Sequence, residues 1–266
     1  MCGGGGWDPG EATDDTQMAV LVGESLLECD GLELPDVFRR FQRWAAAEPK
    51  DIGLQTEAVL SGGDPWDLAA ALHFQTSGRA AGNGALMRAS TSAVYFAGDG
   101  TGADPLEALP GSLNLVHPVH RARYATVLTA DWHPDRATAG GLGVSPRKNS
   151  NGAVWPCLGS AVWALRSTCS YEDAVRAAVD LGGDTDTVAA VTGGLAGAVY
   201  GVEGIPGRWV EPLHVPLPGF DERTLRAPEL VELAERLSWG GRAPEVPGAS
   251  GRPKAPGAGA PRSPRV

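Results

Sequence analysis

The stretch Asp180-Leu181-Gly182-Gly183-Asp184-Thr185-Asp186-Thr187 separates two segments of helical pattern. Its two glycines give the backbone unusual freedom directly before two aspartates that flank a threonine. After Thr187 an apolar run begins at Val188 and continues to Tyr200, which predicts a helix with both aspartates at its amino-terminal end.

A second acidic cluster, Thr13-Asp14-Asp15-Thr16, stands near the other end of the chain. It precedes apolar residues three and four apart, at Met18, Leu21, Val22 and Leu26, as one face of a helix requires. Taken alone, such a tetrapeptide is more often a solvated helix cap. If the two helix starts meet in space, however, their carboxylates repel one another unless a cation neutralises them. Oxygen-only ligands favour magnesium or manganese over zinc, so the pair of clusters predicts a hard-metal site.

Capping and proline signals mark the starts of further helices. Proline in the first turn and a capping side chain before it are typical of helix amino termini. Few stretches alternate with the period of two that a half-buried strand requires, so we predict an all-α fold. The predicted starts are Leu34-Pro35, Asp64-Pro65, Pro156, Ser170-Tyr171-Glu172-Asp173 and Ala227-Pro228-Glu229.

Length and charge limit the kind of protein this can be. A chain of 266 residues can bury a substantial core, and we predict one domain over residues 1–239 and a disordered Pro/Gly-rich basic tail over 240–266. The formal charge is −10, and because the tail holds five basic side chains and one acidic one, the rest carries about −14. So acidic a surface disfavours nucleic acid as a partner, although metals and helix amino termini still permit an anionic nucleotide.

Cysteine usage and hydropathy indicate the compartment. The four cysteines are scattered and form no CxxC pair, which favours reduced thiols. Residues 1–6 show no secretory signal, and the longest small-apolar run, from Val188 to Val202, is too short to cross a bilayer. We therefore predict a cytoplasmic protein that does not bind membranes.

Three motifs together resemble those of the ADP-ribosylglycohydrolase family, which includes the dinitrogenase-reductase-activating glycohydrolases and the J-type lens crystallins. They are Ala12-Thr13-Asp14-Asp15-Thr16-Gln17-Met18-Ala19, Gly82-Asn83-Gly84-Ala85-Leu86-Met87-Arg88 and Asp180-Leu181-Gly182-Gly183-Asp184-Thr185-Asp186-Thr187. Their order makes a far more specific signature than any one alone, and the resemblance covers most of residues 7–239.

The resemblance implies a compact multi-helix domain with two divalent cations, Mg²⁺ or Mn²⁺, at the bottom of a cleft. Asp186 is the expected bridge between the cations, and Met87 and Arg88 are expected to pack and anchor their segment. Gly82, Asn83, Gly84 and Gly183 are the expected substrate-binding residues. The implied metal ligands are Thr13, Asp14, Asp15, Asp184, Asp186 and Thr187.

The predicted reaction is hydrolysis of the glycosidic bond between ADP-ribose and a protein side chain or small acceptor. A paired-metal site can fix the ribose hydroxyls and lower the pKa of a bound water, and nearby negative charge stabilises an oxocarbenium-like transition state. Asp14, Asp15 and Asp184 are the candidates for positioning or deprotonating that water. The expected partner is an ADP-ribosylated protein or a small ADP-ribose conjugate, and the expected state is a monomer.

The chain departs from the family pattern in two places. Family members begin with a glycine-rich apolar helix and an acidic loop that closes over the substrate; neither is recognisable before Thr13, so we expect truncation at the amino terminus. We also expect a shortened segment between Phe96 and Ala130, with the usual threonine-histidine helix missing. These departures keep a second interpretation open, a non-catalytic ADP-ribose-binding or structural relative that has lost its substrate-covering flap.

Other chemistry has less support. A metal-dependent phosphohydrolase is chemically possible but no motif favours it. The histidines show no HExxH or similar spacing, so we do not expect them to bind metal. They are His73, His117, His120, His133 and His214.

Overall fold

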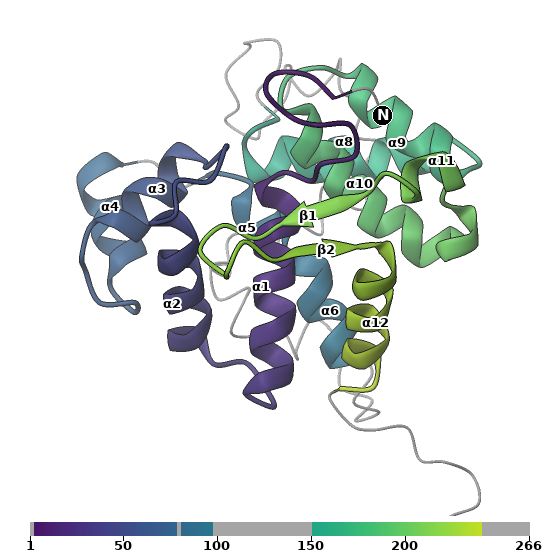
Figure 1. The fold of residues 1–266 in the computed structure, drawn as a ribbon. Helices are drawn as coiled ribbons and strands as arrows, with labels where there is room; N and C mark the ends of the chain where they lie inside the picture. The colour runs from purple at the N-terminus through teal and green to yellow at the C-terminus, as the bar shows by residue number, and fades with distance from the viewer. Residues whose placement is uncertain (1–2, 79–80, 98–150, 241–266) are drawn as a thin grey trace, which may run out of the picture.

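The computed structural model describes residues 3–78, 81–97 and 151–240 (Figure 1). The all-α prediction is confirmed: in these ranges helices dominate, and the strands form one two-stranded sheet. Among the described helices, none combines the length and the apolar character needed to cross a membrane. The predicted tail and most of the segment between Phe96 and Ala130 lie outside the described residues.

The central helix is α1 (Asp14–Glu28), which packs against α2 (Leu34–Ala45), α6 (Ala89–Ala97) and α12 (Ala227–Ser238). A second layer consists of α8 (Val154–Arg166), α9 (Tyr171–Asp180) and α10 (Thr185–Tyr200), and it meets α1 through α10 (Figure 1). The remaining elements are α3 (Leu54–Ser61), α4 (Ala69–Ser77), α5 (Gly84–Met87), η1 (Val202–Gly204), α11 (Gly207–Val210), β1 (His214–Pro216) and β2 (Thr224–Arg226).

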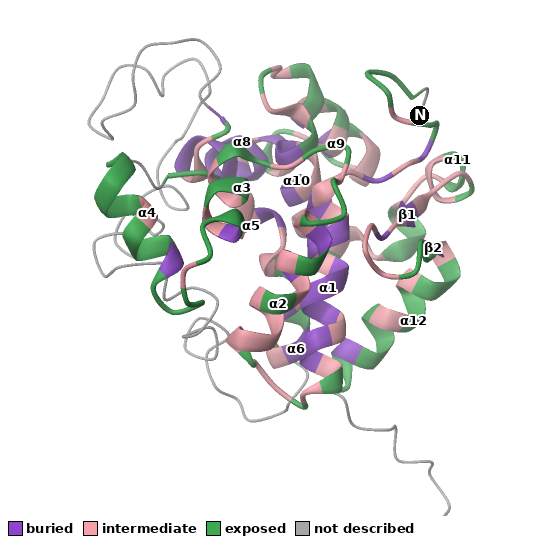
Figure 2. Cartoon of the chain, turned by 60° about the vertical axis from the view of Figure 1, so that its left-hand side comes forward, coloured by how far each residue is buried: buried purple, intermediate pink, exposed green. Residues whose placement is uncertain are grey.

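The core forms around the apolar face of α1 that the sequence pattern predicts. Met18, Leu21 and Leu26 are fully buried, and much of α1 is coloured as buried in Figure 2. Trp44 of α2 is equally buried, and its indole Nε1 donates a 2.8 Å hydrogen bond to Oε1 of Gln17. The contacts that bury α1 in the core, including the hydrogen bond from Trp44 to Gln17, therefore also hold the first turn of α1 in place.

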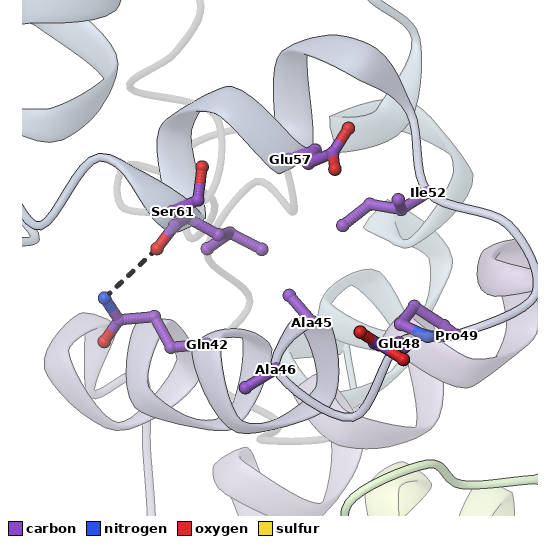
Figure 3. A pocket seen from close by; sticks show the side chains of 9 residues that line it. Gln42, Ala45, Ala46, Glu48, Pro49, Ile52, Glu57 and Ser61 are labelled. Carbon is purple, nitrogen blue, oxygen red and sulfur yellow. Dashed lines mark hydrogen bonds between the residues drawn. The ribbon is translucent and has the colours of Figure 1, made fainter.

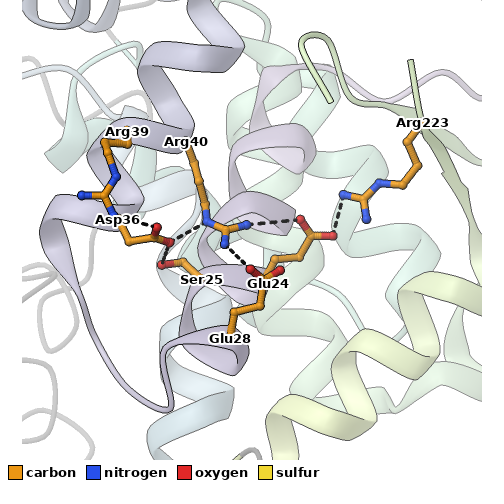
Figure 4. Close-up of polar contacts among 7 residues, drawn as sticks. All are labelled: Glu24, Ser25, Glu28, Asp36, Arg39, Arg40 and Arg223. Carbon is orange, nitrogen blue, oxygen red and sulfur yellow. Dashed lines mark hydrogen bonds and ion pairs between the residues drawn. The ribbon is translucent and has the colours of Figure 1, made fainter. Parts of the chain in front are cut away.

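A charged network fixes α2 against the solvent side of α1 (Figure 4). Arg40 of α2 forms ion pairs with Asp36, Glu28 and Glu24 at 2.6, 2.5 and 3.7 Å. Its side chain is only 15% exposed, so these contacts stabilise more than a typical surface pair does. Arg223 pairs with Glu24 at 2.7 Å and ties the loop between β1 and β2 to the same network.

The amino-terminal segment joins the small sheet before α1 begins. The N–H of Ala12 donates to the carbonyl of His214 at 2.9 Å, and the N–H of His214 donates to the carbonyl of Gly10 at 2.9 Å. Gly10 has φ +83°, and a Cβ there would overlap the backbone of Pro212. Glycine is thus required for this close approach, which holds the start of α1 against β1.

The helix starts at Leu34, Ser170 and Ala227 are confirmed, and the start at Pro156 is confirmed within two residues because α8 begins at Val154. The hydroxyl of Ser170 accepts the N–H of Asp173 at 3.1 Å, as a cap should.

The predicted helix start at Asp64-Pro65 is wrong. Residues 66–68 form a turn, in which the N–H of Leu68 donates a hydrogen bond to the carbonyl of Pro65. Helix α4 starts only at Ala69. A proline in a turn and a proline in the first helical turn have the same backbone φ, so the dipeptide alone did not separate them.

Candidate metal centre

The first turn of α1 carries the Thr13 cluster. Thr13 is the residue before the helix, and its hydroxyl donates to Oδ2 of Asp15 at 2.8 Å. Asp15 is 2% exposed, and its other oxygen, Oδ1, is buried with no hydrogen-bond partner in the part of the chain described. A buried carboxylate oxygen without a donor is unfavourable, so this atom is a candidate for contact with a cation.

The amino terminus of α10 carries the second cluster. Gly182 and Gly183 adopt left-handed φ angles of +72° and +79° and turn the chain into the helix. Asp184 is the capping position, Asp186 lies in the first turn and is exposed, and Thr187 is buried. Since α10 packs on α1, the two helix starts meet, as the sequence analysis required.

A third segment of the chain, not predicted from the sequence, brings another carboxylate to the two clusters. Asp51 lies in the loop between α2 and α3, and carboxylate oxygens of Asp14, Asp51 and Asp186 all lie within 4.8 Å of one another. The only sequence feature that could have indicated Asp51 is its position two residues before Gly53, the residue that precedes α3. Nothing in that pattern specifies proximity to α1 or α10.

The carboxylates share an unfavourable environment. Burial raises the pKa of Asp15 to about 7, and the hydroxyl of Thr13 lowers it only in part. Burial, Asp51 and Asp186 together raise the pKa of Asp14 to about 6. The pKa of Asp186 is raised by burial and by Asp184. Without a neutralising cation, Asp14, Asp15 and Asp186 therefore keep their protons to a higher pH than ordinary carboxyls do.

Two asparagines orient Asp184. Nδ2 of Asn83 donates to Oδ2 of Asp184 at 2.8 Å and to the carbonyl of Asn151 at 3.2 Å. Oδ1 of Asn151 accepts the N–H of Asp184 at 3.0 Å, and its Nδ2 donates to the carbonyl of Gly182 at 2.8 Å. Both asparagines are buried. Asn83 was predicted to contact substrate, but here it holds Asp184; Asn151 was not predicted, because an asparagine before a glycine also suits any turn.

The glycines predicted for substrate binding border this arrangement. Gly82 forms an isolated bridge with Ala153, and its N–H donates to Gln55 at 3.3 Å. Gly84 opens α5, and Gly183 is exposed beside Asp184. Met87 is buried, and Arg88 packs on the ring of Phe41 at 4.8 Å and on Sδ of Met18 at 3.5 Å, so both pack and anchor their segment.

A cavity of about 360 Å³ lies between α2 and α3, and its lining includes Pro49 and Ile52 of the loop that carries Asp51 (Figure 3). Ala45, Ile52 and Leu60 form its apolar part, and Glu48 and Glu57 lie at its edge. It contains none of the clustered aspartates, so we do not assign the metal centre to it.

The donor set fits a hard divalent cation. Every candidate ligand atom is a carboxylate or hydroxyl oxygen, the pKa values of Asp14 and Asp15 are raised, and one buried carboxylate oxygen has no hydrogen-bond partner among the described residues. The residues that could hold such a cation are Thr13, Asp14, Asp15, Asp51, Asp184, Asp186 and Thr187.

Comparison with known proteins decides the family. Residues 1–132 and 101–244 match a family model described as ADP-ribosylglycohydrolase. The chain belongs to the ADP-ribosylglycohydrolase family. The resemblance inferred from the three sequence motifs is thereby confirmed.

Individual members of the ADP-ribosylglycohydrolase family align over most of the chain. The ADP-ribosyl-[dinitrogen reductase] glycohydrolase of Rhodospirillum rubrum is 27% identical over 248 residues, covering 80% of this chain and 78% of that protein. The ADP-ribosylarginine hydrolase Tri1 of Serratia proteamaculans is 28% identical over 80% of this chain, which spans 66% of that longer protein. A solved ADP-ribosylglycohydrolase-related protein complex superposes with a TM-score of 0.63 at 29% identity, covering 91% and 87% of the two chains.

The role of Asn83 can be tested apart from catalysis. We expect Asn83→Ala to weaken Mn²⁺ binding by about 10- to 100-fold, because Asp184 loses the donor that orients it. Isothermal titration calorimetry measures this directly. Ser25→Ala is the matched control, since Ser25 is also buried and also donates to a carboxylate, Asp36, at 2.8 Å. Equal affinities in the two variants would contradict an orienting role for Asn83.

Proposed function

We propose that this protein hydrolyses the glycosidic bond between ADP-ribose and a protein side chain or small acceptor, using two Mg²⁺ or Mn²⁺ ions. The observation that carries the proposal is the convergence of Asp14, Asp51 and Asp186 from three separate segments, next to the unpartnered buried oxygen of Asp15. The names of the relatives from Rhodospirillum and Serratia, which describe removal of ADP-ribose from a protein and from arginine, support the same reaction class.

Divalent cations held at this centre would bind ribose hydroxyls and would lower the pKa of a bound water molecule. The residues that would hold them are Thr13, Asp14, Asp15, Asp184, Asp186 and Thr187. The structure adds Asp51 as a candidate on the exposed side of the group.

The protein side chains have separate tasks. Asp14, Asp15 and Asp184 position the attacking water or accept its proton, and their negative charge stabilises positive charge that develops at the anomeric carbon. Asn83 donates to Oδ2 of Asp184 and so fixes the orientation of that carboxylate. Gly82, Gly84 and Gly183 are proposed to contact the ADP-ribosyl group through their backbone, which carries no side chain.

A soluble monomer in the cytoplasm is part of the proposal. Among the described cysteines, Cys29, Cys157 and Cys169 are free thiols, which suits a reducing compartment. The described residues also include no membrane-spanning helix.

The function is tested with purified protein and ADP-ribosylated arginine, serine and asparagine-type substrates, each with Mg²⁺, Mn²⁺ or a chelator. We expect release of ADP-ribose that depends on the metal, quantified by chromatography. Tight ADP-ribose binding without release would overturn the catalytic proposal, and release of phosphate would replace it with phosphohydrolase chemistry.

A further inference from the structure

Asp51 occupies an electrostatically unfavourable place. It belongs to the irregular loop between α2 and α3, and it faces the carboxylates of Asp14 and Asp186 within 4.8 Å. Like charges at this distance repel, and a loop residue can move away more readily than residues in the first turn of a helix. Its position therefore depends on what fixes the residues on either side.

The residue before Asp51 is fixed by contacts with the amino-terminal segment. Nζ of Lys50 donates to Oε2 of Glu11 at 2.7 Å and to the carbonyl of Gly6 at 3.2 Å, and it lies 5.4 Å from the ring centroid of Trp7. The Glu11 side chain is only 5% exposed, whereas that of Lys50 is 49% exposed. Lys50 thus reaches from the loop to a shielded acceptor.

Glu11 is itself held in place. Its Oε2 accepts the N–H of Asp8 at 2.8 Å, and its neighbours Gly10 and Ala12 are hydrogen-bonded to His214 of β1. Desolvation raises the pKa of Glu11, but the Asp8 N–H and Lys50 outweigh it, and the net pKa lies below the ordinary value. The acceptor is therefore a charged carboxylate attached to the sheet.

The same geometry explains a second acidic group. Asp8, Glu11 and His214 place potential ligand atoms within 4.8 Å of one another, which resembles a metal site. The ammonium of Lys50, 2.7 Å from Glu11, already supplies positive charge there. We therefore interpret Asp8, Glu11 and His214 as the acceptor site for Lys50, and we do not propose a metal ion there.

The residue after Asp51 is fixed by the core. Ile52 packs against the cluster that includes Trp44 and Leu60. Gly53 then precedes α3, with its carbonyl accepting the N–H of Glu57 at 2.9 Å. Asp51 is held from both sides, but only the Lys50 side depends on an ion pair.

We propose that Lys50 and Glu11 are positioning residues that hold Asp51 at the metal centre. The amino-terminal segment, residues 6–12, then contributes to the centre through the loop that it anchors, in addition to leading into α1. The effect on metal binding rests on the proposed function, whereas the anchoring of the loop rests on the contacts alone.

The test compares Lys50→Met with Arg223→Met in the full-length protein. Both substitutions remove a 2.7 Å ion pair to a glutamate, and the two cations are 49% and 47% exposed. The partner of Arg223, Glu24, lies near the carboxyl-terminal end of α1, whereas Asp14 of the metal centre lies at its start. We expect Lys50→Met to weaken Mn²⁺ binding by about tenfold, as loss of a group that orients a ligand typically does, and Arg223→Met to change it less than about twofold. Glu11→Gln should weaken Mn²⁺ binding as Lys50→Met does. Lys50→Arg, which keeps the positive charge, should retain the wild-type Mn²⁺ affinity.

Hydrogen–deuterium exchange of residues 46–54, recorded with a chelator, tests the anchoring without metal. We expect faster exchange in Lys50→Met and Glu11→Gln than in Arg223→Met. If exchange is unchanged, or if Arg223→Met loses as much Mn²⁺ affinity as Lys50→Met, the positioning role is wrong. If the wild-type protein binds no Mn²⁺ while exchange still responds to Lys50→Met, the anchoring stands and the metal centre of the proposed function fails.

Discussion

Replacing Asp184 and Asp186 together with asparagine is expected to reduce metal-dependent release of ADP-ribose by about a thousandfold or more. The reason is that the substitution removes both carboxylates from the amino terminus of α10, one of which lies within 4.8 Å of Asp14 and Asp51. Calorimetric titration should show the loss of Mn²⁺ binding in parallel. The α10 helix should persist, because the side chain of Asp184 makes no capping hydrogen bond to it.

A control with the same change of charge separates this result from general surface effects. Asp180 and Asp221 are both exposed and lie outside the carboxylate group. Their double replacement by asparagine should leave turnover within about twofold of wild type, as surface substitutions usually do. Undiminished turnover of the Asp184/Asp186 variant would refute the proposed centre.

Replacing Asp15 with asparagine is expected to stabilise the metal-free protein at pH 8, by on the order of 2 kcal/mol, while removing most of its metal affinity. The pKa of Asp15 in the folded protein is raised from 3.8 to about 7, so between these values the folded state binds more protons than the unfolded state. The free energy of unfolding must then fall as pH rises from about 4 to about 7. Asp14, with its pKa raised to about 6, acts in the same direction.

Urea denaturation at pH 5 and pH 8, with a chelator and with Mn²⁺, measures this effect. Asp36→Asn is a control of opposite sign. Burial raises the pKa of Asp36, but hydrogen bonds from Arg40 and Ser25 outweigh it and the net pKa is lowered, so this variant should be destabilised at pH 8 (Figure 4). A metal-free wild-type protein that is more stable at pH 8 than at pH 5 would contradict the raised pKa of Asp15.

Local patterns were sufficient for much of the fold. The apolar spacing after Thr13 gave the buried face of α1, and the cap at Ser170 gave the start of α9, because both signals act within one or two helical turns. Asp64-Pro65 misled because a turn and a helix start share the same dipeptide preference. The helix α3 was missed because its residues carry no proline or capping side chain at the start, only Gly53.

The candidate centre was predictable only where its residues occur as motifs. Both aspartate clusters and Asn83 belong to such motifs, and in the structure Asn83 donates to Asp184. Asp51 and Asn151 reach the site through tertiary contacts of the α2–α3 loop and of the chain just before α8. Spacing along one sequence carries no record of such contacts.

The hydrogen bond between Asn83 and Asp184 joins residues 101 positions apart, and the carboxylates that meet beside it come from the segment of Asp184 and from two further segments. Long-range contacts of this kind form late, because the chain must first close large loops. A partly folded chain therefore possesses isolated aspartates but no centre. Divalent cations would bind only to the completed fold and would stabilise it. The amount of metal bound at saturation would therefore measure how many molecules in a preparation are correctly folded.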